Sequence, residues 1–227
     1  MVQGSPGHQL FGLRDQGSET DRRGDHPGQR LWRSGRGLFP HLAHGEHGST
    51  EGGGVTDFPT LTTYVALGAN IGDPEANINE ALALLENYGH DISYEAQSEI
   101  YRTEPQGQVK DQPWFYNAVV RLQVASDVWA PAGLLSTLQA IETQMGRMHG
   151  GTAGGPRVID LDLLMYGDTE MESDYLTLPH PRMLERAFVL VPLRDVAPKL
   201  VFKDGRNIDQ VLAGLAYTLD GQTITQK

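Results

Sequence analysis

Two aspartates, two positions apart, are the strongest candidates for chemistry in the sequence. Asp160 and Asp162 stand in the otherwise apolar run VIDLDLLMY, residues 158–166. In a β-strand, residues i and i+2 point to the same face, so the two carboxylates lie side by side and repel each other. Mg²⁺ would relieve this repulsion, because it binds one or two carboxylates together with substrate phosphates. The alternative is a solvated face on which both acids are ordinary surface charges.

Arginines near this pair point to phosphate as the ligand. Arg147 and Arg157 flank a glycine-rich loop, and Arg186 follows later in the chain. Guanidinium groups bind phosphate oxygens bidentately and stay charged. Strict alternation places Arg157 on the face opposite Asp160, so Arg157 must lie in the loop or reach around the strand end. A lone arginine is more often a surface ion pair, but two beside a carboxylate pair suggest phosphoryl transfer.

Other polar and aromatic residues could contact the rest of a nucleotide or a flat ring. His180 lies between two prolines in TLPHPRM and could contact phosphate or ribose, or be an ordinary turn residue. Phe188 and Asn117 could stack on and hydrogen-bond to a heterocycle, although each alone is more often packing or strand pairing. Gln139 and Glu142 are three apart in a predicted helix, so they share a flank and can act on one ligand.

The elements that must position these residues follow a β-α-β-β-α-β order. Strands are predicted at 62–70, 91–103, 112–124 and within 154–168, and helices at 72–89 and 131–146. This split βαβ order predicts a mainly antiparallel sheet with helices packed on one face. The chain from Pro179 onward reads as turns and short helices, with Pro192 and Pro198 limiting their length.

Apolar periodicity predicts which faces of these elements are buried. In the first helix, Asp73 is the expected cap and Pro74 suits the first turn. The buried stripes of the two helices are Ile78, Leu82 and Leu85, and then Leu134, Leu138, Ile141 and Met145. In the last strand, the residues predicted to bury one face, opposite the two acids, are Ile159, Leu161, Leu163 and Met165.

Composition excludes whole classes of function. The chain of 227 residues has no cysteine, which excludes disulfides, a thiol nucleophile and a zinc–thiolate site. Its formal net charge of −11 disfavours a general nucleic-acid binder, although a local basic cluster can still bind a small anion. No apolar run reaches about 18 residues, and the N-terminus lacks the apolar core of a signal peptide. We therefore expect a cytoplasmic protein without a membrane span.

Residues 1–57 differ from the rest of the chain. They carry 13 of the 27 glycines and 5 of the 8 histidines, with little aliphatic periodicity. Such a segment cannot bury enough apolar surface to offset its ordering entropy, so we predict a disordered extension before a domain at 58–227. The spacing of His41, His44 and His47 does not place all three on one short helical face, which favours a low-complexity tail over a metal cluster.

A further hypothesis is that this extension is absent from the natural chain. Codons for Glu51 and the following three glycines are purine-rich, like a ribosome-binding site, and Val55 can be encoded by a GTG start codon. The true chain would then begin near Val55.

Taken together, the motifs resemble those of a known enzyme family. From about Thr62 to Leu215, the segments LGANIGD, YRTEPQG, DQPWFYNAV, IETQMGR, GPRVIDLDLLMYG and LPHPRMLERAFVLVPLRDVAP follow in order. In these motifs and their spacing, the chain resembles 6-hydroxymethyl-7,8-dihydropterin pyrophosphokinase, an enzyme of folate synthesis. The resemblance implies a ferredoxin-like α/β fold and transfer of pyrophosphate from ATP to the pterin hydroxymethyl group, with release of AMP.

The resemblance also implies residue roles by motif position. Asp160 and Asp162 would hold two Mg²⁺ ions bridging the triphosphate, while Arg147 and Arg157 would bind phosphates. Positions that match the ATP side are Gln139, Glu142, His149, Leu163, Thr177, His180 and Arg186. Positions that match the pterin side are Thr103, Pro105, Gln106, Phe115, Asn117 and Phe188, with Phe188 stacking on the ring.

The glycine-rich loop departs from the family's pattern. Gly154 stands where many relatives carry an aromatic residue, and His149 stands where arginine is common. The segment MHGGTAGG, residues 148–155, contains neither Arg nor Lys. We predict that closing this loop over ATP costs more ordering entropy than in those relatives.

Two other functions compete with the pyrophosphokinase. The first is a non-catalytic nucleotide- or pterin-binding module with the same fold, in which the altered loop has lost the chemistry. The second is a nucleic-acid-binding ferredoxin-like domain, which the acidity of the chain disfavours. We expect a monomer whose partners are ATP and the pterin, with no nucleic acid and no membrane.

Overall fold

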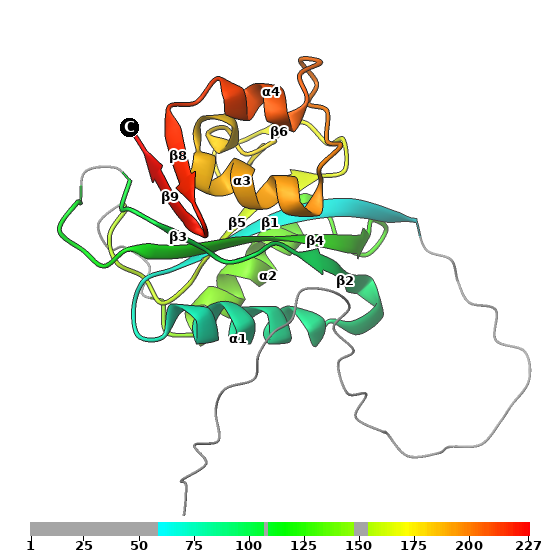
Figure 1. Cartoon of the computed structure of the whole chain (residues 1–227). Helices are drawn as coiled ribbons and strands as arrows, with labels where there is room; N and C mark the ends of the chain where they lie inside the picture. The colour runs from blue at the N-terminus through cyan, green and yellow to red at the C-terminus, as the bar shows by residue number, and fades with distance from the viewer. Residues whose placement is uncertain (1–58, 107–108, 148–153) are drawn as a thin grey trace, which may run out of the picture. The chain divides into compact units, whose positions relative to one another are not determined.

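A seven-stranded sheet forms the centre of the computed structural model, which describes residues 59–106, 109–147 and 154–227. Contacts divide the chain into the units Met1–Gly53 and Gly54–Lys227, and the described residues belong to the second. The strands are β1 (Thr60–Ala69), β2 (Ile92–Gln97), β3 (Tyr101–Thr103), β4 (Phe115–Ala125), β5 (Asp160–Tyr166), β8 (Tyr217–Asp220) and β9 (Thr223–Gln226). Their hydrogen-bonded order is β5-β1-β4-β3-β9-β8, and β2 also pairs with β4 (Figure 1).

The first five strands confirm the predicted β-α-β-β-α-β core. The predicted strand 91–103 is divided into β2 and β3, which follow each other along the same edge of β4. Strands β1, β4 and β5 pair antiparallel, as do β2 and β3 with β4. This arrangement is ferredoxin-like, with β4 and β1 at the centre of the core. Helices α1 (Pro74–Glu86) and α2 (Pro131–Gln144) cover one face of the sheet (Figure 1).

Helix α1 begins and packs as its sequence predicts. The Asp73 side chain accepts a hydrogen bond from the backbone N–H of Ala76 at 3.1 Å, and Pro74 occupies the first turn. Ile78 and Leu85 are among its buried residues, together with Leu82. The helix ends at Glu86, and a single 3-10 turn, η1 (Gly89–Asp91), leads into β2. Capping and the apolar stripe therefore account for this element.

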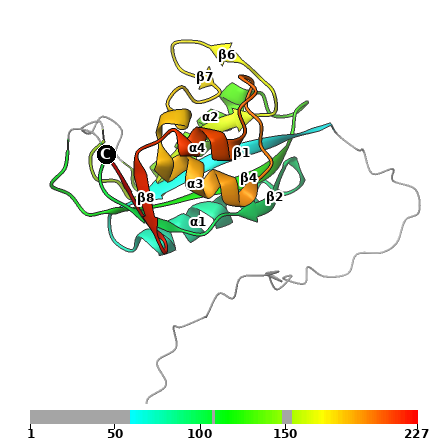
Figure 2. The same cartoon turned by 45° about the horizontal axis from the view of Figure 1, so that its top comes forward.

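The opposite face of the sheet is covered too, which the sequence did not predict. Helix α3 (Ala187–Val196) packs there with α4 (Ile208–Ala213), after the 3-10 turn η2 (Met183–Glu185) (Figure 2). A second core joins α3 to the sheet, with Val119, Leu164 and Leu190 all fully buried. The prediction that helices pack on one face holds for α1 and α2, and the chain after β5 adds a second apolar layer on the other face.

Pro192 does not limit its helix as expected. Helix α3 continues for four residues beyond it, to Val196. A proline inside a helix removes one backbone hydrogen bond, which costs about 3 kcal/mol in an exposed helix. Here Leu190 and Leu193 on either side are fully buried, and this packing against the sheet offsets the loss.

A bulge in β5 changes one predicted face. Ile159, Leu161 and Leu163 lie in the core shared with α1 and α2, as predicted. The register with β1 then shifts, since Val65 pairs with Leu163 whereas Tyr64 pairs with Met165. The prediction that Met165 shares this face is wrong, because the extra residue turns its side chain toward the core under α3.

The C-terminal chain contains strands as well as the predicted short helices. A two-stranded sheet joins β6 (Met171–Glu172) to β7 (Thr177–Leu178), and β8 and β9 form a hairpin that extends the main sheet. Strand β9 pairs parallel with β3. Within the described ranges, no helix has both the length and the apolar character needed to span a bilayer.

Candidate functional site

The two aspartates lie on the sheet face that carries α3. Leu161 and Leu163 alternate with them and point into the other core, so Asp160 and Asp162 share one face, as predicted. In the antiparallel register Asp160 lies opposite Gly68 and Asp162 opposite Ala66. Gly68 has no side chain and Ala66 only a methyl group, so β1 places no large side chain beside the carboxylates.

Asp160 is held between two arginines. Its Oδ1 lies 2.5 Å from the guanidinium of Arg147, and its Oδ2 pairs with the guanidinium of Arg157. Arg157 precedes β5 and reaches the acid from the loop, which confirms the predicted way for it to join the site. The three side chains are 18–25% exposed, so they remain accessible to a charged ligand.

Glu142 is a buried acid that contacts both Arg147 and the strand of Asp160. Its side chain is 3% exposed, and Oε1 accepts a hydrogen bond from the Leu161 N–H at 2.6 Å. The same oxygen pairs with Arg147. Burial raises the pKa of the Glu142 carboxyl, while the Leu161 hydrogen bond and Arg147 oppose the rise. Glu142 thus fixes both Arg147 and the strand that carries Asp160.

Asp162 is the more available of the two acids. Its side chain is 39% exposed, and its nearest cation is Arg186, at 4.0 Å. Desolvation by the surrounding protein raises the pKa of Asp162 to about 6, with the negative charge of Asp160 as the second cause. Arg186 and the two loop arginines act in the opposite direction. The pair therefore carries the like-charge repulsion expected from its spacing.

This donor set fits a divalent cation that also binds substrate phosphates. Two carboxylates on one face supply hard oxygen ligands, and an added cation would offset their mutual repulsion. Within the described residues, no group of three or more His, Cys, Asp or Glu side chains forms a complete metal cage. The remaining oxygen ligands must then come from a bound substrate or from water.

A row of residues across three strands connects the acids to the predicted pterin side. Gly68 of β1 lies opposite Asp160 on one side and opposite Asn117 of β4 on the other. A Cβ at position 68 would lie only 2.8 Å from Asn117 Oδ1, so the Asn117 amide occupies the space above this glycine. Asn117 Nδ2 donates to Thr103 Oγ1 at 2.6 Å. With strands spaced by roughly 4.8 Å, Asn117 and Asp160 are about 10 Å apart across the sheet.

The two aromatic residues of the predicted pterin side, Phe115 and Phe188, each lie against the guanidinium group of an arginine. Arg157 lies over the Phe115 ring, 5.8 Å from its centroid, and Arg186 lies over the Phe188 ring at 5.5 Å. Both rings are half-buried. Each arginine thus joins an aromatic residue of the predicted pterin side to an acid of the predicted phosphate side, which brings the two sides of the site together.

Two amide side chains that the sequence did not single out organise the surrounding loops. Asn70 is 3% exposed, accepts a hydrogen bond from the Arg157 N–H at 2.8 Å, and donates to Gln112 Oε1 at 3.1 Å. Gln112 Nε2 donates in turn to the Gly154 carbonyl at 2.7 Å. The signal for Asn70 was its position directly after an apolar strand, but its partners are distant in sequence and could not be predicted.

The other predicted residues are spread around this centre. The His180 N–H donates to the Leu164 carbonyl at 2.8 Å, and burial, followed by Arg186, lowers the pKa of the imidazole. Thr177 of β7 is half-buried, Gln139 of α2 is exposed, and the Leu163 side chain lies in the core.

Pro105 of the predicted pterin side is buried, and Gln106 Nε2 donates to the Gln226 carbonyl at 3.4 Å. His149 and most of the glycine-rich loop lie outside the described residues.

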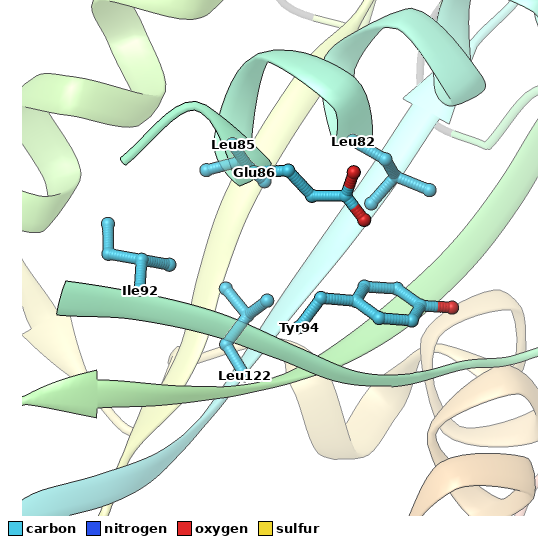
Figure 3. A pocket seen from close by; sticks show the side chains of 6 residues that line it. All are labelled: Leu82, Leu85, Glu86, Ile92, Tyr94 and Leu122. Atoms are coloured by element: carbon cyan, nitrogen blue, oxygen red, sulfur yellow. The ribbon is translucent and has the colours of Figure 1, made fainter. Parts of the chain in front are cut away.

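A separate pocket lies between α1 and β2, away from the acids (Figure 3). It is lined by Leu82, Leu85, Glu86, Ile92, Tyr94 and Leu122. Most of these side chains belong to the core on the other face of the sheet. We therefore assign the chemistry to the face that carries the acids.

Comparison with known proteins identifies the family of this chain. The family model described as 7,8-dihydro-6-hydroxymethylpterin-pyrophosphokinase (HPPK) matches residues 64–198. This chain belongs to the HPPK family. The match spans β1 to α3 and includes the two acids, the three arginines and Asn117. The resemblance noted in the motifs is confirmed.

Related proteins carry the same name, some within longer chains. The chain is 40% identical to 2-amino-4-hydroxy-6-hydroxymethyldihydropteridine pyrophosphokinase of Pseudomonas aeruginosa, over 68% of this chain and 91% of that protein. It is 44% identical to the folate synthesis bifunctional protein of Arabidopsis thaliana, over 62% of this chain but only 29% of that protein. A crystal structure of wild-type HPPK-DHPS from Plasmodium falciparum shares the fold, with a TM-score of 0.53 and 16% identity over 70% of this chain and 45% of that one.

Proposed function

We propose that this HPPK chain transfers pyrophosphate from ATP to the hydroxymethyl group of 6-hydroxymethyl-7,8-dihydropterin, giving AMP and the pterin diphosphate for folate synthesis. Family membership and the names of its relatives support the reaction. The observation that carries its assignment to this site is the acid pair on β5, flanked by Arg147, Arg157 and Arg186 and joined through Gly68 to Asn117.

The transfer requires the pterin hydroxyl oxygen to bond to the β-phosphorus of ATP. The bond from that phosphorus to the oxygen bridging the α- and β-phosphates breaks, AMP leaves with this oxygen, and the hydroxyl proton passes to water. We infer that Arg147 and Arg157 bind phosphate oxygens, exchanging their contacts with Asp160 for the ligand. Such a reaction depends mostly on positioning and on neutralising phosphate charge, and three guanidinium groups at the site suit both tasks.

Asp160 and Asp162 are the proposed ligands of two Mg²⁺ ions. When bound, the ions would neutralise triphosphate charge and favour the ionised form of the attacking hydroxyl. The carboxylates supply the protein's share of the oxygen ligands, and the like-charge repulsion between them supports a cation at this position. Titration of Mg²⁺ into the enzyme with a non-hydrolysable ATP analogue measures the number of ions.

The pterin side is proposed from the row of small and polar residues. Asn117 and Thr103 supply hydrogen-bonding groups, and Phe115 and Phe188 supply two half-buried aromatic rings. Pro105 and Gln106 belong to the loop that follows Thr103.

Several further residues remain predictions for the ATP side, namely Gln139, Glu142, His149, Leu163, Thr177 and His180. For Glu142 the contacts support an indirect role, through Arg147.

An AMP-release assay with ATP and the pterin tests the function. We expect wild-type turnover, and loss of at least about a hundredfold in kcat for Asp160→Asn and Asp162→Asn, with the melting temperature retained. Asp168→Asn is the matched control, because this exposed aspartate follows β5 by two residues and lies outside the site. Wild-type turnover in both acid variants would refute the role of the pair. ATP binding without AMP formation would instead favour a non-catalytic binding module.

Three proposals concern the state of the chain. We propose a catalytic domain at 58–227 that acts as a monomer in the cytoplasm. Light scattering after size-exclusion chromatography measures the oligomeric state, and an estimate of twice 24.9 kDa would contradict the monomer.

A further inference from the structure

The C-terminal hairpin lies beyond the part of the chain that matches the family model. The match ends at residue 198, whereas β8 and β9 occupy Tyr217–Asp220 and Thr223–Gln226. The hairpin lies along β3 and beside α3 (Figures 1 and 2). Strand β3 ends at Thr103 and α3 contains Phe188, and both residues belong to the proposed pterin side.

The hairpin is attached firmly to the sheet. Strand β9 pairs in parallel with β3, so that Thr223 lies opposite Arg102 and Ile224 opposite Thr103. The Ile224 side chain is 1% exposed within the core under α3. The Arg102 N–H also donates to the Gln222 carbonyl at 2.7 Å. This anchoring keeps the following residues at a fixed position next to the site.

Gln226 uses its backbone to bind the loop after Thr103. Its N–H donates to Glu104 Oε1 at 3.0 Å, and its carbonyl accepts from Gln106 Nε2 at 3.4 Å. The loop that carries Pro105 is therefore joined at two points to the last strand of the sheet.

Gln226 uses its side chain to bind the start of α3. Its Oε1 accepts from the Ala187 N–H at 2.8 Å, and its Nε2 donates to the Glu185 carbonyl at 2.7 Å. Arg186, the residue before the helix, makes no side-chain capping bond. Gln226 thus supplies, from another strand, a cap for an N–H group at the helix start. These two contacts enclose Arg186, and Phe188 follows one residue later.

We infer that Gln226 is a positioning residue that fixes the distance between the Thr103–Gln106 segment and the Arg186–Phe188 segment, and hence the width of the pterin site. This inference rests on the proposed function. Gln226 forms hydrogen bonds with two segments, with the Glu104–Gln106 loop through its backbone and with the start of α3 through its side chain. Losing the side chain therefore frees the start of α3, while the bonds to the Glu104–Gln106 loop remain. The acids, Arg147 and Arg157 are not among its contacts, whereas Arg186 of the ATP side lies between the two residues that it holds, so we expect a smaller effect on ATP than on the pterin.

Three variants separate this role from a general effect on folding. Gln226→Ala removes the side chain, and Gln226→Met keeps its length and apolar stem but neither hydrogen bond. Gln222→Ala is the matched control, because this exposed glutamine lies in the turn of the same hairpin and contributes its backbone carbonyl to Arg102. Melting temperatures are measured for all three, and KM for pterin, KM for ATP and kcat are compared with the wild type.

For Gln226→Ala and Gln226→Met we expect pterin KM to rise about tenfold, as two lost hydrogen bonds allow, while ATP KM rises clearly less. Gln222→Ala should match the wild type. An unchanged pterin KM in Gln226→Met, or equal increases in both KM values, would overturn the inference while leaving the enzyme's function intact. Absence of turnover in the wild-type chain would instead overturn the proposed function, and the inference with it.

Discussion

A single methyl group at position 68 would enter the proposed site. Gly68 has an extended backbone that any residue can adopt, so its role concerns space and not backbone conformation. An added Cβ would lie 2.8 Å from Asn117 Oδ1, which is closer than real Cβ contacts occur. Asn117 would have to move, and its 2.6 Å hydrogen bond to Thr103 would be lost.

We therefore expect Gly68→Ala to raise pterin KM by about tenfold, with a loss of stability of about 1–3 kcal/mol from overpacking. Steady-state kinetics and urea unfolding measure the two effects. Gly133→Ala in α2 is the control, because its nearest neighbour would be a Trp129 ring carbon at 3.9 Å, an ordinary contact. That variant should keep its KM, and a helical alanine should stabilise it by roughly 0.5–1 kcal/mol. Equal KM values in both variants would contradict the role of Gly68.

Glu142 illustrates how one buried acid serves two partners. Gln at this position keeps an acceptor for the Leu161 N–H but loses the charge that pairs with Arg147, whereas Ala loses both contacts. Gln avoids the desolvation cost of a buried charge, and Arg147 is 25% exposed and keeps its pair with Asp160, so Glu142→Gln should change the free energy of unfolding by no more than about 1 kcal/mol. Glu142→Ala leaves a buried N–H unpaired and should cost about 1–3 kcal/mol more. Urea unfolding compares them, and equal losses would show that the ion pair dominates.

At the scale of elements, the packing of α3 contributes to stability and also positions residues of the pterin site. Leu190 belongs to α3 and is fully buried on the sheet face that carries the acids, while Leu85 belongs to α1 and is 2% exposed on the other face. Truncating either to Ala should cost about 2–5 kcal/mol, because each leaves a cavity in a packed core. Only Leu190→Ala should also raise pterin KM, because α3 begins directly after Arg186 and carries Phe188 in its first turn.

Kinetics at a temperature where both variants are folded, checked by circular dichroism, tests this difference. Equal KM values for Leu190→Ala and Leu85→Ala would show that packing of α3 does not reach the site.

The comparison of these elements shows where sequence reasoning succeeds and where it stops. The period of two along β5 correctly placed Asp160 and Asp162 on one face, and it required Arg157 to join them from the loop or around the strand end. The same rule failed at Met165, because a bulge depends on pairing with β1 and not on the strand's own residues. The contact of buried Glu142 with Arg147 was also missed, because Glu142 becomes buried only when α2 packs against β5. Local periodicity thus predicts faces, while contacts between distant segments need the folded chain.

The β8–β9 hairpin was missed for a related reason. Its strands, Tyr217–Asp220 and Thr223–Gln226, have only four residues each, and only Ile224 is buried. Such short strands give little periodicity to detect. Their stability depends on β3, which lies more than a hundred residues earlier in the chain.

At the scale of the whole chain, the first unit is expected to be dispensable. Contacts separate Met1–Gly53 from Gly54–Lys227, and every proposed site residue lies in the second unit. A chain that begins at Val55 should therefore keep its melting temperature within about 2 °C and keep its kcat. Differential scanning fluorimetry and the AMP-release assay measure both, and a clear loss of either would give the extension a role. Mass spectrometry of the native protein tests the start near Val55, which detection of a peptide from residues 1–50 would exclude.

The charge distribution has a consequence for how fast ATP reaches the site. The first 58 residues hold six basic and seven acidic side chains, so nearly all of the net charge of −11 lies on the part of the chain that carries the site. At long range this surface repels a polyanion, whereas Arg147, Arg157 and Arg186 attract it at close range. At about 0.15 M salt the Debye length is about 8 Å, which screens the distant repulsion more than the direct contacts. The association rate of ATP should therefore be favoured, and not slowed, by moderate ionic strength.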